Sequence, residues 1–192
     1  MKFYVIAYGN PEDKRQGIFS INFDKKTKDI KLLNFYPTEN KPASLIVKNE
    51  KIIMSSINLE TKKGSLSILD VKDDNNLVEE ANYEQEYFYS HLDISKDGKY
   101  LLGASFYDGV DGIIDLDNLE KSISTHTHNF RKRTDKPIQQ ACHSHFIGMT
   151  PDSKYVYSVD IGTDEVLVYD FKNGIITLNK EKSLDRPLGT RS

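Results

Sequence analysis

Two histidines one residue apart, His143 and His145, form the pair in this sequence that most suggests chemistry. A strand-like run follows them, then a turn of sequence P-D-S-K, a second strand and the segment D-I-G-T-D, which contains Asp160 and Asp164. Two consecutive antiparallel strands begin and finish at the same end of a sheet, so the residues before the first strand should lie near the residues after the second. The pattern therefore predicts that the two histidines and the two aspartates lie near one another.

These residue types leave several interpretations open. His143 and His145 have the same parity along a strand, so both side chains should point the same way, toward either a reaction site or a neighbouring loop. A His-x-His pair also suggests a metal, but zinc usually requires a third ligand and supporting hydrogen bonds. Asp160 and Asp164 are compatible with simple turn chemistry, because aspartate stabilises tight turns.

The strands that must position these residues recur in a fixed order. The turn sequences K-N-E-K, K-D-G-K and P-D-S-K begin at positions 48, 96 and 151, about 48 and 55 residues apart, and each separates the first two strands of a series. A period of this length with four strands and no helix is typical of a β-propeller blade, with an antiparallel sandwich as the alternative. We predict an all-β β-propeller of four-stranded antiparallel blades, about four of which occupy segments near 1–40, 41–86, 87–135 and 136–184, with a further blade starting at 185–192.

The composition narrows the class of protein. The 192 residues are 38% hydrophobic and 29% charged with a net charge of −3, which suggests neither a nucleic-acid partner nor a membrane surface. No apolar run approaches the roughly 18 residues of a membrane span, and the N-terminus is typical of a strand rather than a signal peptide. The single cysteine, Cys142, excludes a disulfide within the chain, fits the cytoplasm and is expected to be inert.

The segment from His143 to Asp164 resembles a signature of the bacterial propeller-type lactonases, a family that includes the seven-bladed 6-phosphogluconolactonase type. Gln139 lies four residues before His143, as that signature expects, whereas Ile138 stands where the family often has arginine. Weaker similarities extend over the rest of the chain, at A-S-F-Y-D-G (104–109), at S-H-L-D-I from Ser90 and at the terminal G-T-R-S.

The resemblance implies a cytoplasmic hydrolase of carbohydrate metabolism. Its reaction would convert 6-phospho-D-glucono-1,5-lactone to 6-phosphogluconate in the pentose phosphate pathway of glucose metabolism, without a metal or an organic cofactor. His143 or His145 would be the general base and Asp160 its orienting partner, because imidazole titrates near about pH 6.5 and a carboxylate can fix its tautomer. The substrate-binding residues carried over from the family pattern are Gln139, Asp164, His91 and Arg191.

Two further expectations concern the cations and the remaining histidines. Arg191 and the loop 131–133 are the candidates for holding the 6-phosphate of the substrate. Alignment of the turns places His91 opposite Phe146, which suggests that His91 faces the other side. The second pair, His126 and His128, falls in a polar connection between blades and is expected to be a solvated loop.

The expected length of a complete seven-bladed protein bears on how much of the function this chain can perform alone. Seven blades of about 45 residues make roughly 315 residues, so we expect the chain to be part of a longer protein whose remaining blades complete the site. The 192 residues alone should show little activity. The alternatives are a non-catalytic β-propeller that binds a partner, and a lactonase-fold enzyme acting on a different sugar lactone or on an acyclic diacid.

Overall fold

The computed structural model describes residues 1–9, 15–72 and 75–185. By the pattern of its internal contacts the chain forms two compact units, Met1–Glu84 and Gln85–Ser192. Each unit consists of antiparallel sheets whose strands follow one another in sequence order, joined by tight turns. This arrangement is what regularly spaced short strands separated by polar turns predict.

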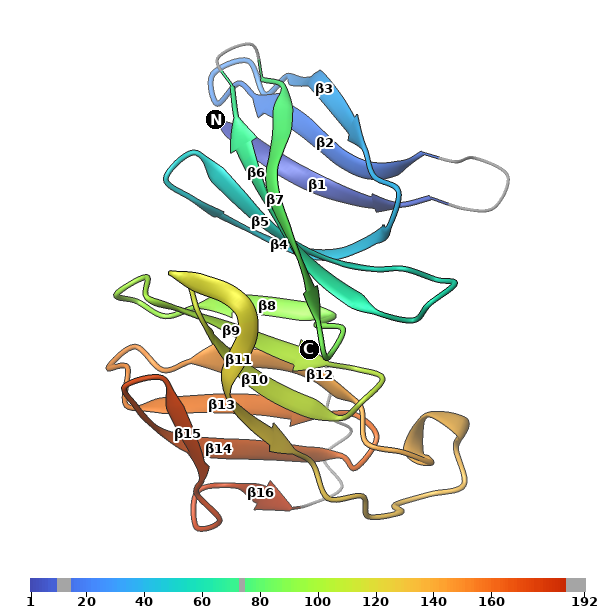
Figure 1. Cartoon of the computed structure of the whole chain (residues 1–192), viewed down its shortest axis with the longest axis vertical. Coiled ribbons are helices and arrows are strands. Elements are labelled where there is room, and N and C mark those ends of the chain that lie inside the picture. Colours follow the sequence, from blue (N-terminus) through green and yellow to red (C-terminus); the bar gives the residue numbers. More distant parts are fainter. Residues whose placement is uncertain (10–14, 73–74, 186–192) are drawn as a thin grey trace. The chain divides into compact units, whose positions relative to one another are not determined.

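Unit 1 contains a three-stranded and a four-stranded sheet (Figure 1). The first sheet consists of β1 (Lys2–Tyr8), β2 (Gln16–Phe23) and β3 (Ile30–Pro37). The second consists of β4 (Lys41–Lys48), β5 (Lys51–Ile57), β6 (Gly64–Val71) and β7 (Leu77–Gln85). The core of this unit is built from apolar side chains of β2, β5 and β6, namely Ile18, Ile52, Met54 and Leu69, with Leu77.

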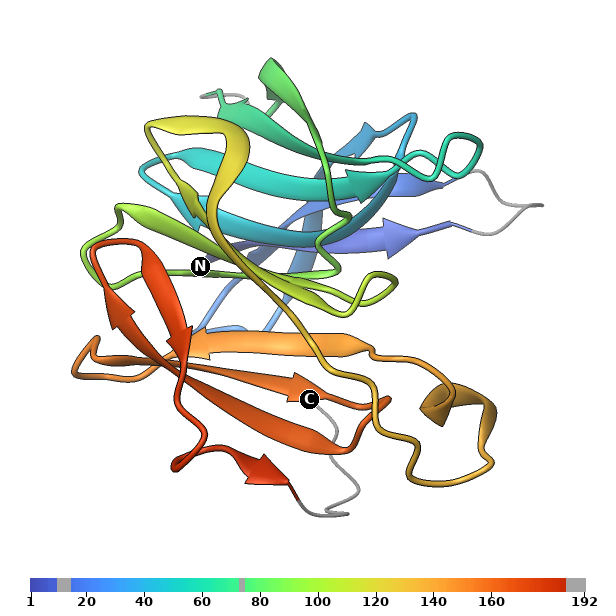
Figure 2. The ribbon, with the colours of Figure 1, turned by 60° about the horizontal axis from the view of Figure 1, so that its bottom comes forward.

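Unit 2 contains two further sheets (Figure 2). One consists of β8 (His91–Ile94), β9 (Tyr100–Ser105), β10 (Val110–Asp115) and β11 (Asn118–Thr127). The other consists of β12 (Ser144–Met149), β13 (Tyr155–Asp160), β14 (Glu165–Lys172) and β15 (Ile175–Leu178), and the short β16 (Leu184–Asp185) also pairs with β14. A 3-10 turn, η1 (Pro137–Gln139), lies in the connection between β11 and β12.

Local sequence explains where the strands end and which faces are buried. In β13 buried and half-buried residues alternate strictly, so Val156, Ser158 and Asp160 face inward, as period-2 geometry requires. The turn before β13 needs a residue with positive φ, and Ser153 takes φ 58°, while Gly98 supplies φ 68° at the matching turn of the preceding sheet. The all-β architecture of four antiparallel sheets predicted from the sequence is confirmed.

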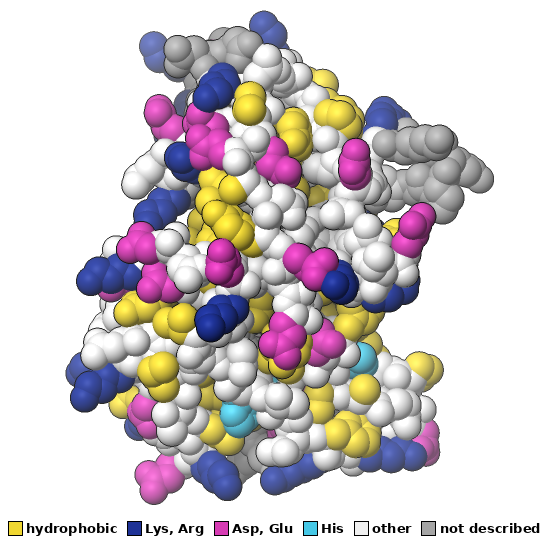
Figure 3. All heavy atoms as spheres, in the orientation of Figure 1, with side chains coloured by type: hydrophobic (Ala, Val, Ile, Leu, Met, Phe, Trp, Pro, Cys, Tyr) yellow, Lys and Arg dark blue, Asp and Glu magenta, His cyan; other side chains and the backbone are white. Residues whose placement is uncertain are grey.

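The surface carries both signs of charge. On the face that Figure 3 shows, acidic and basic side chains are interspersed over both units, in keeping with the small net charge. In the part of the chain that the structure describes, no helix is long and apolar enough to cross a membrane.

Candidate active site

The two histidines of the signature lie at the start of β12. His143 immediately precedes the strand, and Ser144 pairs with Asp160 of β13 while Phe146 pairs with Val159. His145 is therefore the extra residue of a β-bulge, a feature that often re-aims a side chain next to an active site. The predicted meeting of this segment with the end of β13 is present in the structure.

Both imidazole rings contact Phe106, which lies in the turn after β9. The ring of His143 stacks on Phe106 with centroids 4.4 Å apart and planes 17° apart, and the ring of His145 meets it edge-on at 6.0 Å. The two histidines thus reach the same aromatic ring, although the bulge at His145 breaks the strict alternation on which the parity expectation relied. Phe106 belongs to the turn that matches A-S-F-Y-D-G in the sequence.

A backbone carbonyl fixes the tautomer of His143. Its Nδ1 lies 2.9 Å from the carbonyl oxygen of Phe106, and because a carbonyl only accepts, Nδ1 must carry the proton and donate it. In the neutral ring Nε2 is then the atom with a free lone pair. The orienting role that the sequence assigned to Asp160 is performed here by a main-chain oxygen.

Asp160 has a different role from the one expected. Its Oδ1 accepts the backbone N–H groups of His143, Gly162 and Thr163 at 2.9, 2.8 and 2.9 Å. Its Oδ2 faces Nδ1 of His128 at 2.6 Å. Asp160 therefore ties the start of β12 to the D-I-G-T-D turn and holds the backbone of His143 rather than its imidazole.

Glycine is required at the centre of that turn. A Cβ added to Gly162 would lie 1.9 Å from the carbonyl oxygen of Ala141, so the turn can approach the chain before β12 only without a side chain. Asp164 follows two residues later with φ 57°, a left-handed conformation that aspartate tolerates, and its side chain is buried. This geometry is what the turn interpretation of Asp164 describes.

Behind Asp160 lies a buried group of polar side chains, called here the polar hub: Asp111, His128, Ser144, Ser158, Asp160 and Tyr169. His128 is its centre, with Nε2 2.8 Å from Asp111 and Nδ1 2.6 Å from Asp160. Asp111 also accepts the hydroxyl groups of Tyr169 and Ser144, both at 2.6 Å, and of Ser158 at 3.0 Å. The prediction that His128 belongs to a solvated loop is wrong, and His126 is part of β11.

The hub is held together by charge. Burial alone would lower the pKa of His128, but the carboxylates of Asp111 and Asp160 outweigh it and raise that pKa to about 10. Burial would likewise raise the pKa of both aspartates, yet the charge and hydrogen bonds of His128 hold both below their ordinary value. At neutral pH the hub therefore contains one imidazolium between two carboxylates.

His91 lies close to the histidine pair. Its ring packs on Phe146 with centroids 4.5 Å apart, and its Nδ1 accepts the backbone N–H of Ile147 at 3.4 Å. Burial lowers the pKa of His91, Asp93 raises it and the nearby His145 lowers it further. The alignment of the turns suggested that His91 faces the other side, but its ring contact with Phe146 and the influence of His145 on its pKa show that it lies near this site.

Three further predictions concern Gln139, Arg191 and the basic loop 131–133. Gln139 lies in η1, where its Oε1 accepts the hydroxyl of Thr134 at 2.5 Å. Arg191 lies outside the described residues. Arg133 of the basic loop is engaged by its own unit, since Nε donates to the carbonyl of Thr163 at 2.8 Å and Nη2 contacts Glu165 at 3.1 Å.

Neither Cys142 nor a metal ion is indicated as part of the chemistry by the described residues. Burial, with Asp160 and Glu165, raises the pKa of the Cys142 thiol to about 11, so the thiolate needed for nucleophilic attack is scarce at neutral pH. Among the described residues, no group of three or more His, Cys, Asp and Glu side chains is arranged to hold a metal ion.

The sequence interpretation missed Asp111, His128 and the carbonyl of Phe106. Asp111 carried a signal, because it is an acidic residue inside a strand-like apolar run, where a buried charge requires a partner. His128 carried only a weak signal, since His126 and the cations at 131–133 were equally possible partners in the same polar stretch. The carbonyl of Phe106 carried no signal in the sequence, since every residue has a backbone carbonyl.

Sequential meanders of short antiparallel strands at a regular period define the chain as part of a β-propeller. The family model described as "Lactonase, 7-bladed beta-propeller" matches residues 2–191, and the chain belongs to this family.

Relatives in sequence and in fold cover most of this chain. An uncharacterized protein of Staphylococcus epidermidis is 27% identical over 174 residues, which cover 88% of this chain and 49% of that protein. A Bacteroides fragilis crystal structure, provisionally named a 6-phosphogluconolactonase, has a TM-score of 0.79 at 17% identity and covers 96% of this chain and 55% of its own. The periplasmic gluconolactonase PpgL of Pseudomonas aeruginosa has a TM-score of 0.71 at 18% identity, with 88% and 50% covered. The chain spans about half the length of the curated relatives it matches.

Proposed function

We propose that the site around His143 hydrolyses a sugar lactone in a protein that combines this chain with further blades, and that the substrate is 6-phospho-D-glucono-1,5-lactone. The observation that carries the proposal is the hydrogen bond from Nδ1–H of His143 to the carbonyl of Phe106, because it leaves Nε2 to accept a proton. Membership of the lactonase family supports the reaction class. The proposed setting is the pentose phosphate pathway in the cytoplasm, which the lone cysteine fits.

The chemistry assigns each group one task. Nε2 of His143 takes a proton from water as the water oxygen bonds to the lactone carbonyl carbon, and a tetrahedral oxyanion forms. His145, which meets the Phe106 ring edge-on, provides a donor for this oxyanion, and Gln139 binds substrate hydroxyls. The ring C–O bond then breaks, and the imidazolium of His143 returns its proton to the ring oxygen to give the open-chain acid.

The test replaces each histidine by asparagine in the longer protein. His143→Asn should lower kcat for lactone hydrolysis about 10²- to 10⁴-fold, the usual contribution of a general base. His145→Asn should reduce kcat less, because it shortens and displaces one oxyanion donor and leaves the general base in place. His126→Asn is the matched control, since the ring of His126 packs on Tyr169 and no ring contact joins it to Phe106 among the described residues, and it should leave kcat nearly unchanged. Unchanged hydrolysis in both His143→Asn and His145→Asn would refute the proposal.

An unphosphorylated sugar lactone is the second candidate substrate. Arg133, the cation of the basic loop closest to the turn, is engaged by Thr163 and Glu165, and Lys132 pairs with Asp135 at 2.7 Å. The Arg133 guanidinium is thus committed to contacts within its own unit, whereas Lys132 makes only an exposed ion pair. The discriminating measurement is kcat/KM for the 6-phosphorylated lactone against glucono-1,5-lactone. A phosphate-binding site predicts a ratio well above ten, and a ratio near one favours the second candidate.

A further inference from the structure

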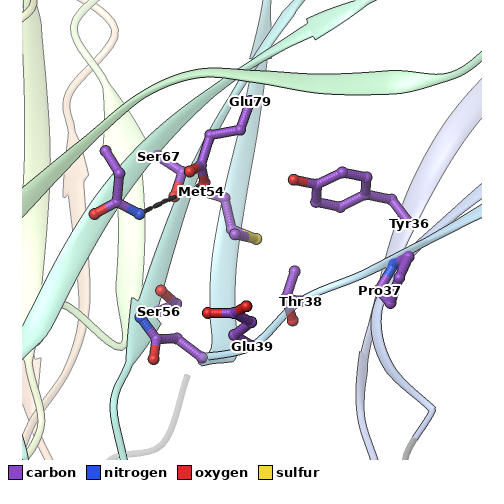
Figure 4. A pocket seen from close by; sticks show the side chains of 10 residues that line it. Tyr36, Pro37, Thr38, Glu39, Met54, Ser56, Ser67 and Glu79 are labelled. Atoms are coloured by element: carbon purple, nitrogen blue, oxygen red, sulfur yellow. Dashed lines mark hydrogen bonds between the residues drawn. The ribbon is translucent and has the colours of Figure 1, made fainter.

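We propose that unit 1 holds a separate ligand site, for a small hydroxylated amine cation of about monosaccharide size. The site is a cavity between the β3–β4 connection and strands β5, β6 and β7 (Figure 4). Its volume of about 340 Å³ lies at the lower end of the range for small-molecule pockets. The lining residues on which the argument depends are Tyr36, Thr38, Glu39, Met54, Ser67 and Glu79.

The cavity exists because unit 1 has short side chains where unit 2 has the polar hub. The backbone N–H of Thr38 donates to Gln16 just beyond the last pair of β2 and β3, as that of His128 donates to Gly109 just beyond the last pair of β10 and β11. Thr38 therefore occupies the position of His128. A hydroxyl and a methyl group take the place of an imidazole ring.

The second equivalence is at the end of β5. Ser56 pairs with Pro42 directly before the bulge in β4, just as Asp160 pairs with Ser144 directly before the bulge in β12. Ser56 thus stands where unit 2 has a carboxylate, and its hydroxyl lies 2.8 Å from that of Ser65. The backbone of unit 1 is equivalent to that of unit 2 at these positions, but its side chains are smaller and occupy less of the space between the strands.

One polar group in the cavity wall lacks a partner. Thr38 Oγ1 is buried and has no hydrogen-bond partner among the described residues. The backbone that carries it is fixed, because the side-chain amide of Gln16 donates to the carbonyls of both Thr38 and Glu39 at 2.8 and 2.7 Å. A buried hydroxyl without a partner is costly, and rotation of the Thr38 side chain about χ1 would present it to a ligand hydroxyl or ammonium group.

The charge of the cavity selects the ligand. Burial and then the carboxylates of Glu79 and Glu39 raise the pKa of Tyr36, so both carboxylates act on the phenol that reaches into the cavity. None of the described lining residues is basic. Two carboxylates and a phenol favour a cation and disfavour an anionic sugar or a phosphate.

The opposite wall is suited to hydroxyl groups. The side-chain amide of Asn82 donates to Ser67 at 2.8 Å and reaches Glu79 at 3.5 Å, so the three polar groups form one line along β6 and β7. Met54 and the ring of Tyr36 supply the apolar contact that the C–H face of a sugar requires. The combination of charge, hydroxyl partners and size points to an amino sugar.

The experiment titrates the 192-residue chain with three probes of equal size by calorimetry: D-glucosamine, D-glucose and D-gluconate. Glucosamine should bind with a Kd of about 1 mM or below, glucose at least about tenfold more weakly, and gluconate not detectably. Glu79→Gln and Glu39→Gln should each weaken glucosamine binding about fivefold to tenfold without changing the affinity for glucose. Glu80→Gln is the matched control on the same strand, because Glu80 pairs with Lys51 instead, and it should leave binding unchanged.

Thr38→Val provides a measurement that does not depend on charge. It preserves the shape of the side chain and removes only the hydroxyl, so it should weaken binding while leaving the unfolding midpoint unchanged or higher. Equal affinity for glucosamine and glucose, detectable binding of gluconate, or no binding of glucosamine by the folded chain would overturn the proposal. None of these outcomes depends on lactone hydrolysis.

Discussion

Replacement of His128 by glutamine tests whether the polar hub is held together by charge. Glutamine keeps hydrogen-bonding groups at the position but removes the positive charge between Asp111 and Asp160, whose side chains are fully buried. Removing one partner from a buried ion pair typically costs about 3–5 kcal/mol, because the remaining charge is left uncompensated. We expect His128→Gln to lower the free energy of unfolding by an amount in this range.

The pKa of His128 gives the same magnitude independently. A rise from the ordinary value of 6.5 to about 10 corresponds to roughly 5 kcal/mol of stabilisation at about 1.4 kcal/mol for each unit. A raised pKa stabilises fully below the unfolded-state value, and the stabilisation is lost as pH rises through the folded-state value. The contribution of His128 should therefore be complete below about pH 6.5 and decline toward pH 10. The lowered pKa values of Asp111 and Asp160 also stabilise the folded chain, and this stabilisation is lost in acid, as pH falls below about 4.

Urea unfolding followed by circular dichroism at several pH values between 5 and 10 would measure this. The difference between the wild type and His128→Gln should be largest near pH 6 and shrink steadily toward pH 10. His126→Gln is the control, because burial lowers the pKa of His126, so its replacement removes less positive charge than that of His128. In the double variant Asp111→Asn/His128→Gln, part of the lost stability should return, since one of the two uncompensated carboxylates is removed. A pH-independent difference, or no loss in His128→Gln, would refute the charge argument.

Three further predictions concern the surroundings of the site. Gly162→Ala should destabilise the chain by about 3 kcal/mol in urea unfolding, because the new methyl group would meet the carbonyl oxygen of Ala141. Tyr169→Phe should cost about 1.5–3 kcal/mol by the same measurement, since its hydroxyl donates to the buried carboxylate of Asp111 at 2.6 Å. Cys142, whose pKa burial and two nearby carboxylates raise to about 11, should react with iodoacetamide at pH 8 at least about tenfold more slowly than free cysteine, and faster as pH rises.

Local sequence patterns were sufficient to predict the framework. The three matching turns gave the period of the sheets, and the alternation of apolar and polar residues gave the strands. The meeting of His143 with the D-I-G-T-D turn also followed, because it depends only on two neighbouring antiparallel strands, β12 and β13. Contacts of this kind join residues close in sequence and need no knowledge of how one sheet packs on another.

The unpredicted part of the site consists mostly of contacts between sheets. His128 comes from a polar stretch that looks solvated, and the carboxylates that bind it, Asp111 and Asp160, lie 17 and 32 residues away in sequence. The imidazole of His143 is oriented by the carbonyl of Phe106, 37 residues earlier, and a main-chain oxygen leaves no mark in the sequence. Both features depend on how the β8–β11 sheet packs against the β12–β15 sheet, and strand patterns alone do not specify that packing.

The two units show what the charged hub contributes. At the equivalent positions unit 1 has Thr38 and Ser56, and this part of the fold forms there without a buried ion pair. The corresponding part of unit 1 therefore folds without such a hub, and burying three charged groups in unit 2 is costly. Asp160 makes the difference, because one oxygen binds the imidazolium while the other holds the backbone N–H of His143 and the turn beside it. We infer that the hub is retained in unit 2 because it fixes the main chain from which His143 reaches Phe106.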